Sequence, residues 1–487
     1  MRAPQWRPIL WAPPWYASVC AAPGLERPRL DRREGIPPAA ALGPEAGRRH
    51  DSSHSQRGVQ VIGRRILAAV LAAVAVVIVA FLLAWSMPAS HRAFLPFGPE
   101  RSCVIAVTDD TDFFEFDNTA PVYALIDSLG LRVTKTVWAF DHEDHPPSRA
   151  GLSLEEPEYL AWVMAERERG HEVILHSATA GDDVREMTLA AHAMLEELMG
   201  EPTRMVIFHS TNLEAFYWGS ERLPNPVLRY LYRLRGGRRE YLGDDEGSPY
   251  YWVDVSRDLV RYVRGYTTND INTLRLNPSM PYEDPWTPVA PLWCASSNGR
   301  LGEEFRRLLA PDNVERLKRE QGASIVYTHF ARGFTESCER GPRVVPELRE
   351  TLVRCGTDPR VEFAPAGEVL DRLRVAQFLE DAVLDGARAG EEVVLMLPPE
   401  LLPVVADVSV VPERLPAPLN APALEEGGTV RLDVWLEAVG WEVRPGAADV
   451  FAAARPLPLR ERWRLVLRWL STSLVSPAYS YESGSLS

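Results

Sequence analysis

The most informative stretch of this chain of 487 residues is Val104-Ile-Ala-Val-Thr-Asp109-Asp110-Thr-Asp112. It is a short apolar run that ends in two adjacent carboxylates. Parallel strands buried on both faces have this pattern, and α/β enzymes place their chemistry at the carboxyl ends of such strands. Two neighbouring anions repel each other, so a metal ion, a proton or a basic partner must compensate them. Capping of the next helix by Asp109 or Asp110 is the alternative interpretation.

Three further apolar runs end in a histidine, and each is predicted to be a strand of the same sheet. They are Val173–Leu175 before His176, Met205–Phe208 before His209, and Ala323–Thr328 before His329. One histidine at a strand end is usually structural, whereas three of them together with an aspartate pair indicate a site. Neutral imidazole and carboxylate groups are the ligands of catalytic zinc and of similar divalent ions.

From about Cys103 to Arg374 the chain resembles the polysaccharide deacetylases with a NodB-homology domain, carbohydrate esterase family four and its relatives. The resemblance lies in the order of the motifs along the chain. These are Val107-Thr-Asp-Asp110, the strand Leu131–Trp138, Gly170-His-Glu172 followed by His176-Ser177, and the late His329. The family implies an irregular (β/α) barrel with the site at the carboxyl ends of the strands.

The resemblance also implies a role for each matching residue. Asp109 would be the general base, Asp110 and His176 would bind a divalent metal ion such as zinc, and His329 would protonate the leaving group. A metal ion can polarise an acyl carbonyl and lower the pKa of bound water. The implied activity is the removal of acyl groups from a polysaccharide.

The chain departs from the family pattern at the second metal histidine, where it has Ala180. Catalytic zinc sites usually have three protein ligands, so another residue must supply the third. His209 is the first candidate, because its strand should neighbour that of His176. Lesser candidates are Asp112, Asp182 and Asp183. Asp112, Asn212 and Trp218 are also candidates for substrate binding, although aromatic clusters after a strand often serve packing.

Two hypotheses from different classes therefore stand side by side. The first is a membrane-anchored, metal-dependent deacetylase-like hydrolase, and the second is a catalytically degenerate polysaccharide-binding protein with the same barrel. A weaker third is glycosidic-bond cleavage by two carboxylates, which requires a separation of about 5 to 10 Å.

The segment Ile66 to Trp85 contains no charged residue and has the length of a transmembrane helix. Arg64 and Arg65 precede it, so a membrane anchor over residues 64–87 would leave the N-terminus cytoplasmic and the catalytic domain extracytoplasmic. A cleaved signal peptide is the alternative. Residues 1–60 have no apolar period and are expected to be disordered, unless translation begins near Val59 or Val61.

The formal net charge of −14 argues against a nucleic-acid partner, which would require a concentrated basic face. The five cysteines lack metal-finger spacing; since export permits a disulfide, Cys338 and Cys355 are the pair to test.

The expected domains are the barrel over residues 100–388, with a long insertion at 237–300, a small β-rich module at 389–475 and a flexible tail at 476–487. Helices are expected at 121–129, 157–169, 183–199, 226–234, 303–319, 346–354 and 367–384.

Overall fold

The computed structural model describes residues 72, 92–141, 151–209, 212–216, 241–283, 289–339, 341–420, 428–446, 450 and 451. The chain divides into two units, Met1–Ala72 and Ala73–Ser487, and the description below concerns the second. The expected disordered segment 1–60, all of the expected anchor except residue 72, the helix expected at 226–234, Trp218 and the tail lie outside the described residues. Within the described part of the chain, no helix is both long and apolar enough to cross a membrane.

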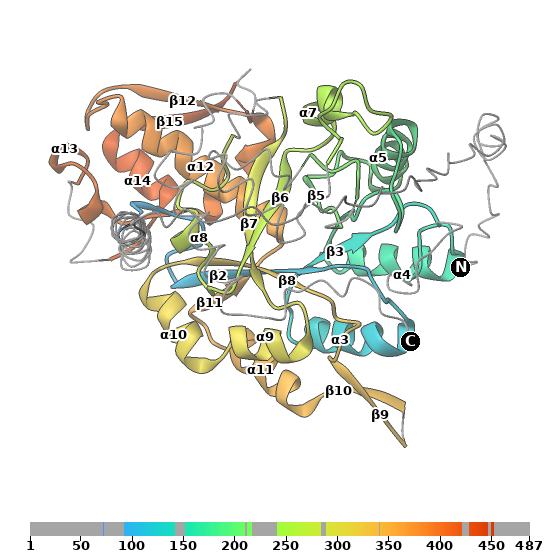
Figure 1. Cartoon of the computed structure of the whole chain (residues 1–487). Coiled ribbons are helices and arrows are strands. Elements are labelled where there is room, and N and C mark those ends of the chain that lie inside the picture. The colour runs from blue at the N-terminus through green and yellow to red at the C-terminus, as the bar shows by residue number, and fades with distance from the viewer. Residues whose placement is uncertain are drawn as a thin grey trace, which may run out of the picture. The chain divides into compact units, whose positions relative to one another are not determined.

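Seven parallel strands close into a barrel (Figure 1). The last of them pairs back onto the first, from Val104 opposite Ala323 to Asp109 opposite Thr328. An eighth strand, β11 (Val361–Phe363), pairs with the first half of β2, while β3 pairs with its second half. The barrel strands are β2 (Cys103–Asp109), β3 (Thr134–Val137), β4 (Glu172–Leu175), β5 (Met205–Val206), β6 (Tyr262–Thr268), β7 (Leu292–Asn298) and β8 (Ala323–Thr328). The expected (β/α) barrel is therefore confirmed: its parallel strands close on themselves.

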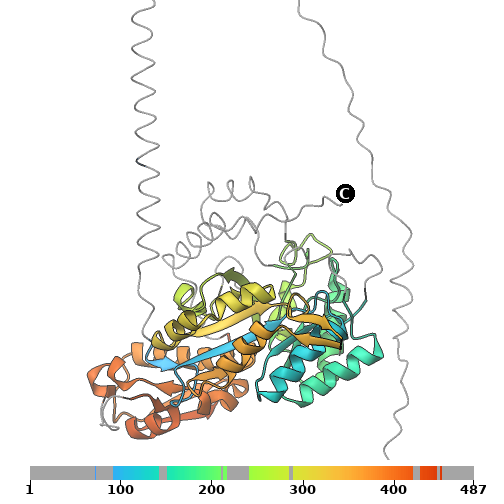
Figure 2. The same ribbon diagram turned by 90° about the horizontal axis from the view of Figure 1, so that it is seen from below.

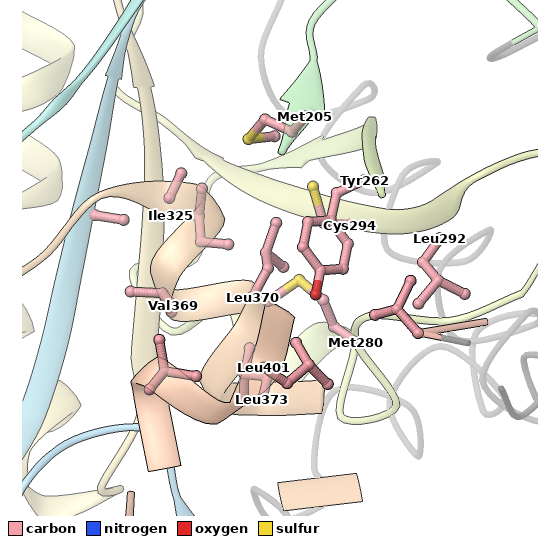
Figure 3. Packing of buried hydrophobic residues seen from close by; sticks show 14 of the residues in the cluster. Met205, Tyr262, Met280, Leu292, Cys294, Ile325, Val369, Leu370, Leu373 and Leu401 are labelled. Atoms are coloured by element: carbon pink, nitrogen blue, oxygen red, sulfur yellow. The ribbon is translucent and has the colours of Figure 1, made fainter. Parts of the chain in front are cut away.

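Strand β2 contributes to two separate cores, because successive side chains of a strand point to opposite faces. Val104 and Ala106 belong to one apolar cluster together with Leu370 of α12 (Ala366–Leu384). Figure 3 shows Leu370 beside Tyr262, Cys294 and Ile325 of the barrel strands. Cys103, Ile105 and Val107 belong to a second cluster that includes residues of the surrounding helices α3 (Phe116–Ser128), α9 (Gly302–Leu308), α10 (Pro311–Arg319) and α11 (Pro346–Gly356). The alternation predicts that Asp109 and Asp110 also face opposite ways.

Helices follow the barrel strands much as the sequence predicts, with one break. The single helix expected at 303–319 is two helices, because Pro311 lacks the N–H that a helix interior requires and instead begins a new helix. The helices are α3 (Phe116–Ser128), α4 (Pro157–Glu168), α5 (Arg185–Met199), α9 (Gly302–Leu308), α10 (Pro311–Arg319) and α11 (Pro346–Gly356).

The segment 237–300, expected to be a long insertion, supplies the barrel strands β6 and β7. Sequence analysis missed both strands because the Gly-, Pro- and Asp-rich turns around them hid their short apolar runs. Between and before them lie η3 (Val253–Val255), α7 (Ser256–Leu259) and α8 (Thr273–Leu276).

The C-terminal region mixes strands and helices (Figure 2). Residues 429–435, within the module expected to be β-rich, form a strand only at Val430–Arg431, because residues 432, 435, 436 and 439 form a buried helical stripe. The elements of the C-terminal region are β12 (Val393–Leu397), η4 (Pro399–Asp407), β13 (Ser409–Val410), η5 (Pro412–Arg414), α13 (Ala417–Asn420), β14 (Val430–Arg431), α14 (Leu432–Val439) and β15 (Trp441–Pro445). Strand β12 pairs with β15, and β13 pairs with both β14 and β1 (Phe94–Leu95).

The expected disulfide is wrong. Cys338 is exposed in the hairpin of β9 (Thr335–Cys338) and β10 (Gly341–Val344), whereas Cys355 is buried in α11. Both thiols are free.

Candidate metal centre and active site

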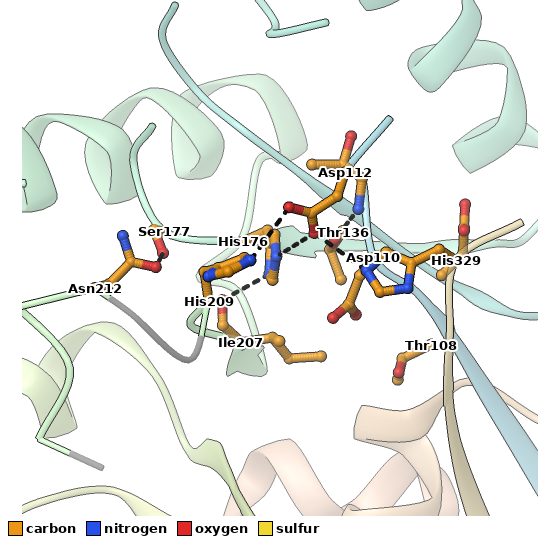
Figure 4. Close-up of polar contacts among 12 residues, drawn as sticks. Thr108, Asp110, Asp112, Thr136, His176, Ser177, Ile207, His209, Asn212 and His329 are labelled. Atoms are coloured by element: carbon orange, nitrogen blue, oxygen red, sulfur yellow. Dashed lines mark hydrogen bonds and ion pairs between the residues drawn. The ribbon is translucent and has the colours of Figure 1, made fainter. Parts of the chain in front are cut away.

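Polar side chains from four barrel strands meet at the carboxyl end of the barrel (Figure 4). Asp110 and Asp112 follow β2, His176 follows β4, His209 lies shortly after β5, and His329 follows β8. Four of the five are at most 4% exposed, whereas the side chain of His209 is 25% exposed. The sequence predicted this convergence, since the carboxyl ends of parallel strands meet at one end of a barrel.

Asp112 lies at the centre of this group. Its Oδ2 is 3.0 Å from Nε2 of His176 and 3.3 Å from Nε2 of His329. Its Oδ1 is 3.5 Å from Nε2 of His209 and, although buried, accepts no hydrogen bond. Burial works to raise the pKa of Asp112, but the charges of His209 and His176 hold it well below its usual range. Among the described residues, this carboxylate is therefore compensated by imidazoles alone.

The other two carboxylates of the 109–112 stretch have strong cationic partners. Arg264 of β6 donates two hydrogen bonds to Asp110, of 3.1 and 2.6 Å, and stacks on the ring of Tyr327 at 4.5 Å. Burial would raise the pKa of Asp110, but the Arg264 guanidinium lowers it below its usual value. Sequence reasoning missed Arg264, whose only signal was a lone arginine within an otherwise uncharged strand.

Asp109 faces the other side of β2, as the strand alternation requires. Its carboxylate accepts hydrogen bonds from the ammonium of Lys135 at 2.8 Å, the hydroxyl of Tyr123 at 3.2 Å and the backbone N–H of Phe330 at 2.8 Å. It lies with the outer helices and outside the group around Asp112. Lys135 is the second residue that sequence reasoning missed in this role.

Backbone carbonyls set the tautomers of two of the histidines. The Nδ1 atoms of His176 and His329 lie 3.1 and 3.2 Å from the carbonyl oxygens of Ile207 and Arg300. A carbonyl can only accept, so each Nδ1 carries a hydrogen, and Nε2 is the ring nitrogen that faces Asp112. Histidine ligands of metal ions are usually oriented in this way.

These residues fit a divalent metal ion. Asp110, Asp112 and His176 each offer one ligand atom, and the three atoms lie within 4.8 Å of one another. Asp112 thus lies where a third ligand is needed, while Ala180 is buried and offers none. Two carboxylates and a neutral imidazole are a suitable donor set for zinc and for other borderline ions.

Asn212, expected to bind substrate, is fully buried. It accepts a hydrogen bond from the hydroxyl of Ser177 at 3.0 Å and donates to the carbonyl of Gly181. Both groups of its side chain are therefore used in hydrogen bonds inside the protein. The two loops that carry His176 and His209 are joined through this side chain.

Asp183, one of the lesser metal candidates, is likewise hydrogen-bonded within its own loop. It accepts hydrogen bonds from the backbone N–H groups of Ala178 and Thr179, each of 3.0 Å. Asp182 accepts from the backbone N–H of Leu213 at 3.0 Å. Neither belongs to the group of ligand atoms around Asp112.

No protein-family profile matches the chain, and no curated protein matches it either. Solved structures similar to it are carbohydrate esterases and deacetylases, the class that the sequence motifs resemble. A family 4 acetyl xylan esterase from Clostridium thermocellum with a cobalt ion is 15% identical, covering 55% of this chain and 89% of the esterase, with a TM-score of 0.27. A chitin deacetylase from Colletotrichum lindemuthianum is 15% identical, covering 56% and 88%, with a TM-score of 0.29.

A peptidoglycan deacetylase from Bacillus subtilis is 11% identical, covering 58% of this chain and 97% of the deacetylase, with a TM-score of 0.29. TM-scores this low do not establish a shared fold. The assignment of the barrel therefore rests on the strand pairing within the chain itself.

Proposed function

We propose that this protein is a metal-dependent hydrolase that removes acyl groups from a polysaccharide. The observation that carries the proposal is the buried carboxylate of Asp112, which has three imidazole neighbours and a free oxygen. A buried anion is costly unless it is paired or binds a metal ion. The motifs that resemble polysaccharide deacetylases supply the substrate class.

In this proposal Asp110, Asp112 and His176 hold the ion. A divalent ion bound there would act as a Lewis acid and would favour ionisation of water near neutral pH. Arg264 keeps Asp110 ionised and fixes its orientation through two hydrogen bonds. The bidentate pair therefore preorganises one ligand before any ion arrives.

The two remaining histidines lie beside Asp112 and serve proton transfer. His209 is the more exposed one, so it takes the proton of the attacking water. His329 presents Nε2 to the site while Arg300 fixes its Nδ1, and it protonates the leaving group. Their Nε2 atoms lie 3.5 and 3.3 Å from the carboxylate oxygens of Asp112, so both imidazoles adjoin the proposed ligands.

The test is elemental analysis of the purified protein before and after chelation, combined with an assay for acetate released from acetylated oligosaccharides. About one zinc or similar ion per chain is expected, and activity should fall on chelation and return with the ion. His176→Ala should lose both, whereas His192→Gln, a change at a buried histidine on α5, should keep both.

Two outcomes would contradict the proposal. A folded protein that binds acetylated sugars equally well with and without chelator, and never releases acetate, would instead be a polysaccharide-binding protein. Loss of the ion in His209→Ala would make His209 a ligand and not the proton acceptor.

The membrane anchor at 64–87 is part of the same proposal, and its support is the uncharged run from Ile66 to Trp85. The full chain should sediment with membranes and require detergent for release. Release by high salt alone would contradict the anchor.

A further inference from the structure

The buried pair Asp109–Lys135 has no role in the proposed chemistry. Lys135 lies opposite Asp109 in the β2–β3 pairing, and its ammonium is 2.8 Å from Oδ2 of Asp109. Both side chains are 1% exposed, and so is the residue Tyr123, whose hydroxyl donates to the same oxygen. One oxygen of Asp109 is thus used entirely by two fixed donors.

The other oxygen of Asp109 holds the backbone beyond His329. Its Oδ1 accepts the N–H of Phe330 at 2.8 Å. On the near side of His329, the N–H of Asp110 donates to the carbonyl of Thr328 at 2.9 Å. The backbone on both sides of His329 is therefore tied to Asp109, the last residue of β2, and to Asp110, which follows it.

The ring of Phe330 strengthens this attachment. It is fully buried and packs edge-on against Tyr123, with 5.6 Å between the ring centroids. The residue between these ties, His329, has its Nε2 3.3 Å from Oδ2 of Asp112. A shift of the 328–330 segment would move that imidazole directly.

We infer that Asp109 is a positioning residue: with Lys135 and Tyr123 it holds the 328–330 segment so that His329 stays against Asp112. The inference rests on the proposed function, in which His329 protonates the leaving group. It differs from the role that the family resemblance implies, the general base. Because both oxygens accept hydrogen bonds on the outer side of β2, outside the group around Asp112, Asp109 is not placed to take the proton of a reacting water.

Three variants of the full chain separate the two roles. Asp109→Asn leaves the ammonium of Lys135 buried without its partner, so loss of activity in this variant alone does not decide. In the double variant Asp109→Asn with Lys135→Met (the Asn/Met protein), the amide oxygen can still accept from the N–H of Phe330, and the amide nitrogen can donate to the Tyr123 oxygen. The double variant Asp109→Ala with Lys135→Met (the Ala/Met protein) is the matched control, because it removes the charge pair and also the oxygen that accepts from the N–H of Phe330.

The measurements are kcat on an acetylated oligosaccharide that the wild type cleaves, hydrogen exchange of the Phe330 amide, and bound metal. The Asn/Met protein should keep the protection of Phe330 and recover activity to within about tenfold of the wild type, because a neutral pair of similar shape can replace a buried ion pair. The Ala/Met protein should bind the ion but lose the protection, and its kcat should fall about 100-fold, the effect of a small misplacement of a catalytic group.

One result would overturn the inference: an Asn/Met protein that is folded, metal-bound and protected at Phe330, yet as inactive as the Ala/Met protein. The carboxylate itself would then be required, as a general base is. If the wild type cleaves no acylated sugar, the proposed function fails, and exchange at Phe330 still decides the positioning role. Equal protection of Phe330 in the two double variants would refute it, and selective loss in the Ala/Met protein would support it.

Discussion

The barrel has a cluster of histidine and carboxylate groups at each end of strand β4. His176 follows the strand and belongs to the group around Asp112, while His171 precedes it and lies with Asp127 and Glu166, near the ends of α3 and α4. Each cluster offers three ligand atoms within 4.8 Å of one another. By residue type and spacing alone, either one could hold a metal ion.

The backbone partner of each histidine separates them. Nδ1 of His171 accepts the N–H of Val133 at 3.1 Å, so the neutral ring carries its hydrogen on Nε2, which donates to Asp127 at 2.9 Å. Nδ1 of His176 donates to a carbonyl instead, so its Nε2, 3.0 Å from Oδ2 of Asp112, is the nitrogen that could bind an ion. A neutral imidazole binds a metal ion only through its unprotonated nitrogen, and His171 has none available.

The two clusters also differ in whether an arginine or lysine pairs with their carboxylates. Arg169 pairs with Glu166 at 2.9 Å and with Asp127 at 3.4 Å, so the cluster before β4 is neutralised by the protein itself. Asp112, after β2, has no lysine or arginine partner among the described residues. The two clusters therefore have the same types of ligand, but they differ in the hydrogen-bond partner that sets which histidine nitrogen can bind an ion.

A large loss of metal affinity is expected when the central carboxylate is removed. Asp112→Asn should weaken zinc binding by more than about 100-fold, beyond what changes around the ligands usually cost, because it removes a charged ligand. Isothermal titration of the metal-free protein measures this. His171→Gln is the matched change in the other cluster. Loss of the ion in this variant would contradict the assignment of the metal site to the group around Asp112.

The next effect concerns the two arginines. Arg264→Met should lower the free energy of unfolding by about 3–5 kcal/mol, because it leaves the buried carboxylate of Asp110 unpaired. Arg169 is half exposed, so Arg169→Met should cost less than about 1 kcal/mol. Denaturant unfolding of the metal-free proteins gives both values, and equal costs would contradict the distinction.

Metal binding should also stabilise the fold. At a zinc concentration 100 times the Kd, the gain is about 2.7 kcal/mol if the unfolded chain does not bind the ion. The wild type and Glu166→Gln should both show this gain in thermal unfolding, and Asp112→Asn should not. A gain that disappears in Glu166→Gln would place the ion in the other cluster.

The smallest effect is a pH dependence of the cluster before β4. Burial, with a contribution from Asp127, raises the pKa of Glu166 from 4.5 to about 7. The folded protein therefore holds a proton that the unfolded chain has released, so this residue makes the protein less stable as the pH rises from about 4.5 to 7. Glu166→Gln should gain about 1–2 kcal/mol relative to the wild type between pH 5 and pH 8, measured by denaturant unfolding. A difference that is constant with pH would show that Glu166 titrates normally.

Sequence reasoning reached the barrel and four residues of the site for one physical reason. Short apolar runs form buried parallel strands, and the polar residues that follow them gather at one end, whatever the length of chain between them. Asp110, His176, His209 and His329 meet on this basis. Alternation along β2 could also have separated Asp109 from Asp110, since neighbouring side chains of a strand face opposite sides.

The partners of these residues came only from the tertiary structure. Lys135 lies 26 residues from Asp109 and Arg264 lies 154 residues from Asp110, and no local pattern pairs charges over such distances. The burial of Asn212 and the carbonyl that faces His176 are likewise set by how loops pack on one another. A sequence fixes which groups are present at a strand end, but which of them are neutralised, and which nitrogen of a histidine is free, depends on neighbours that only the folded chain brings within hydrogen-bonding distance.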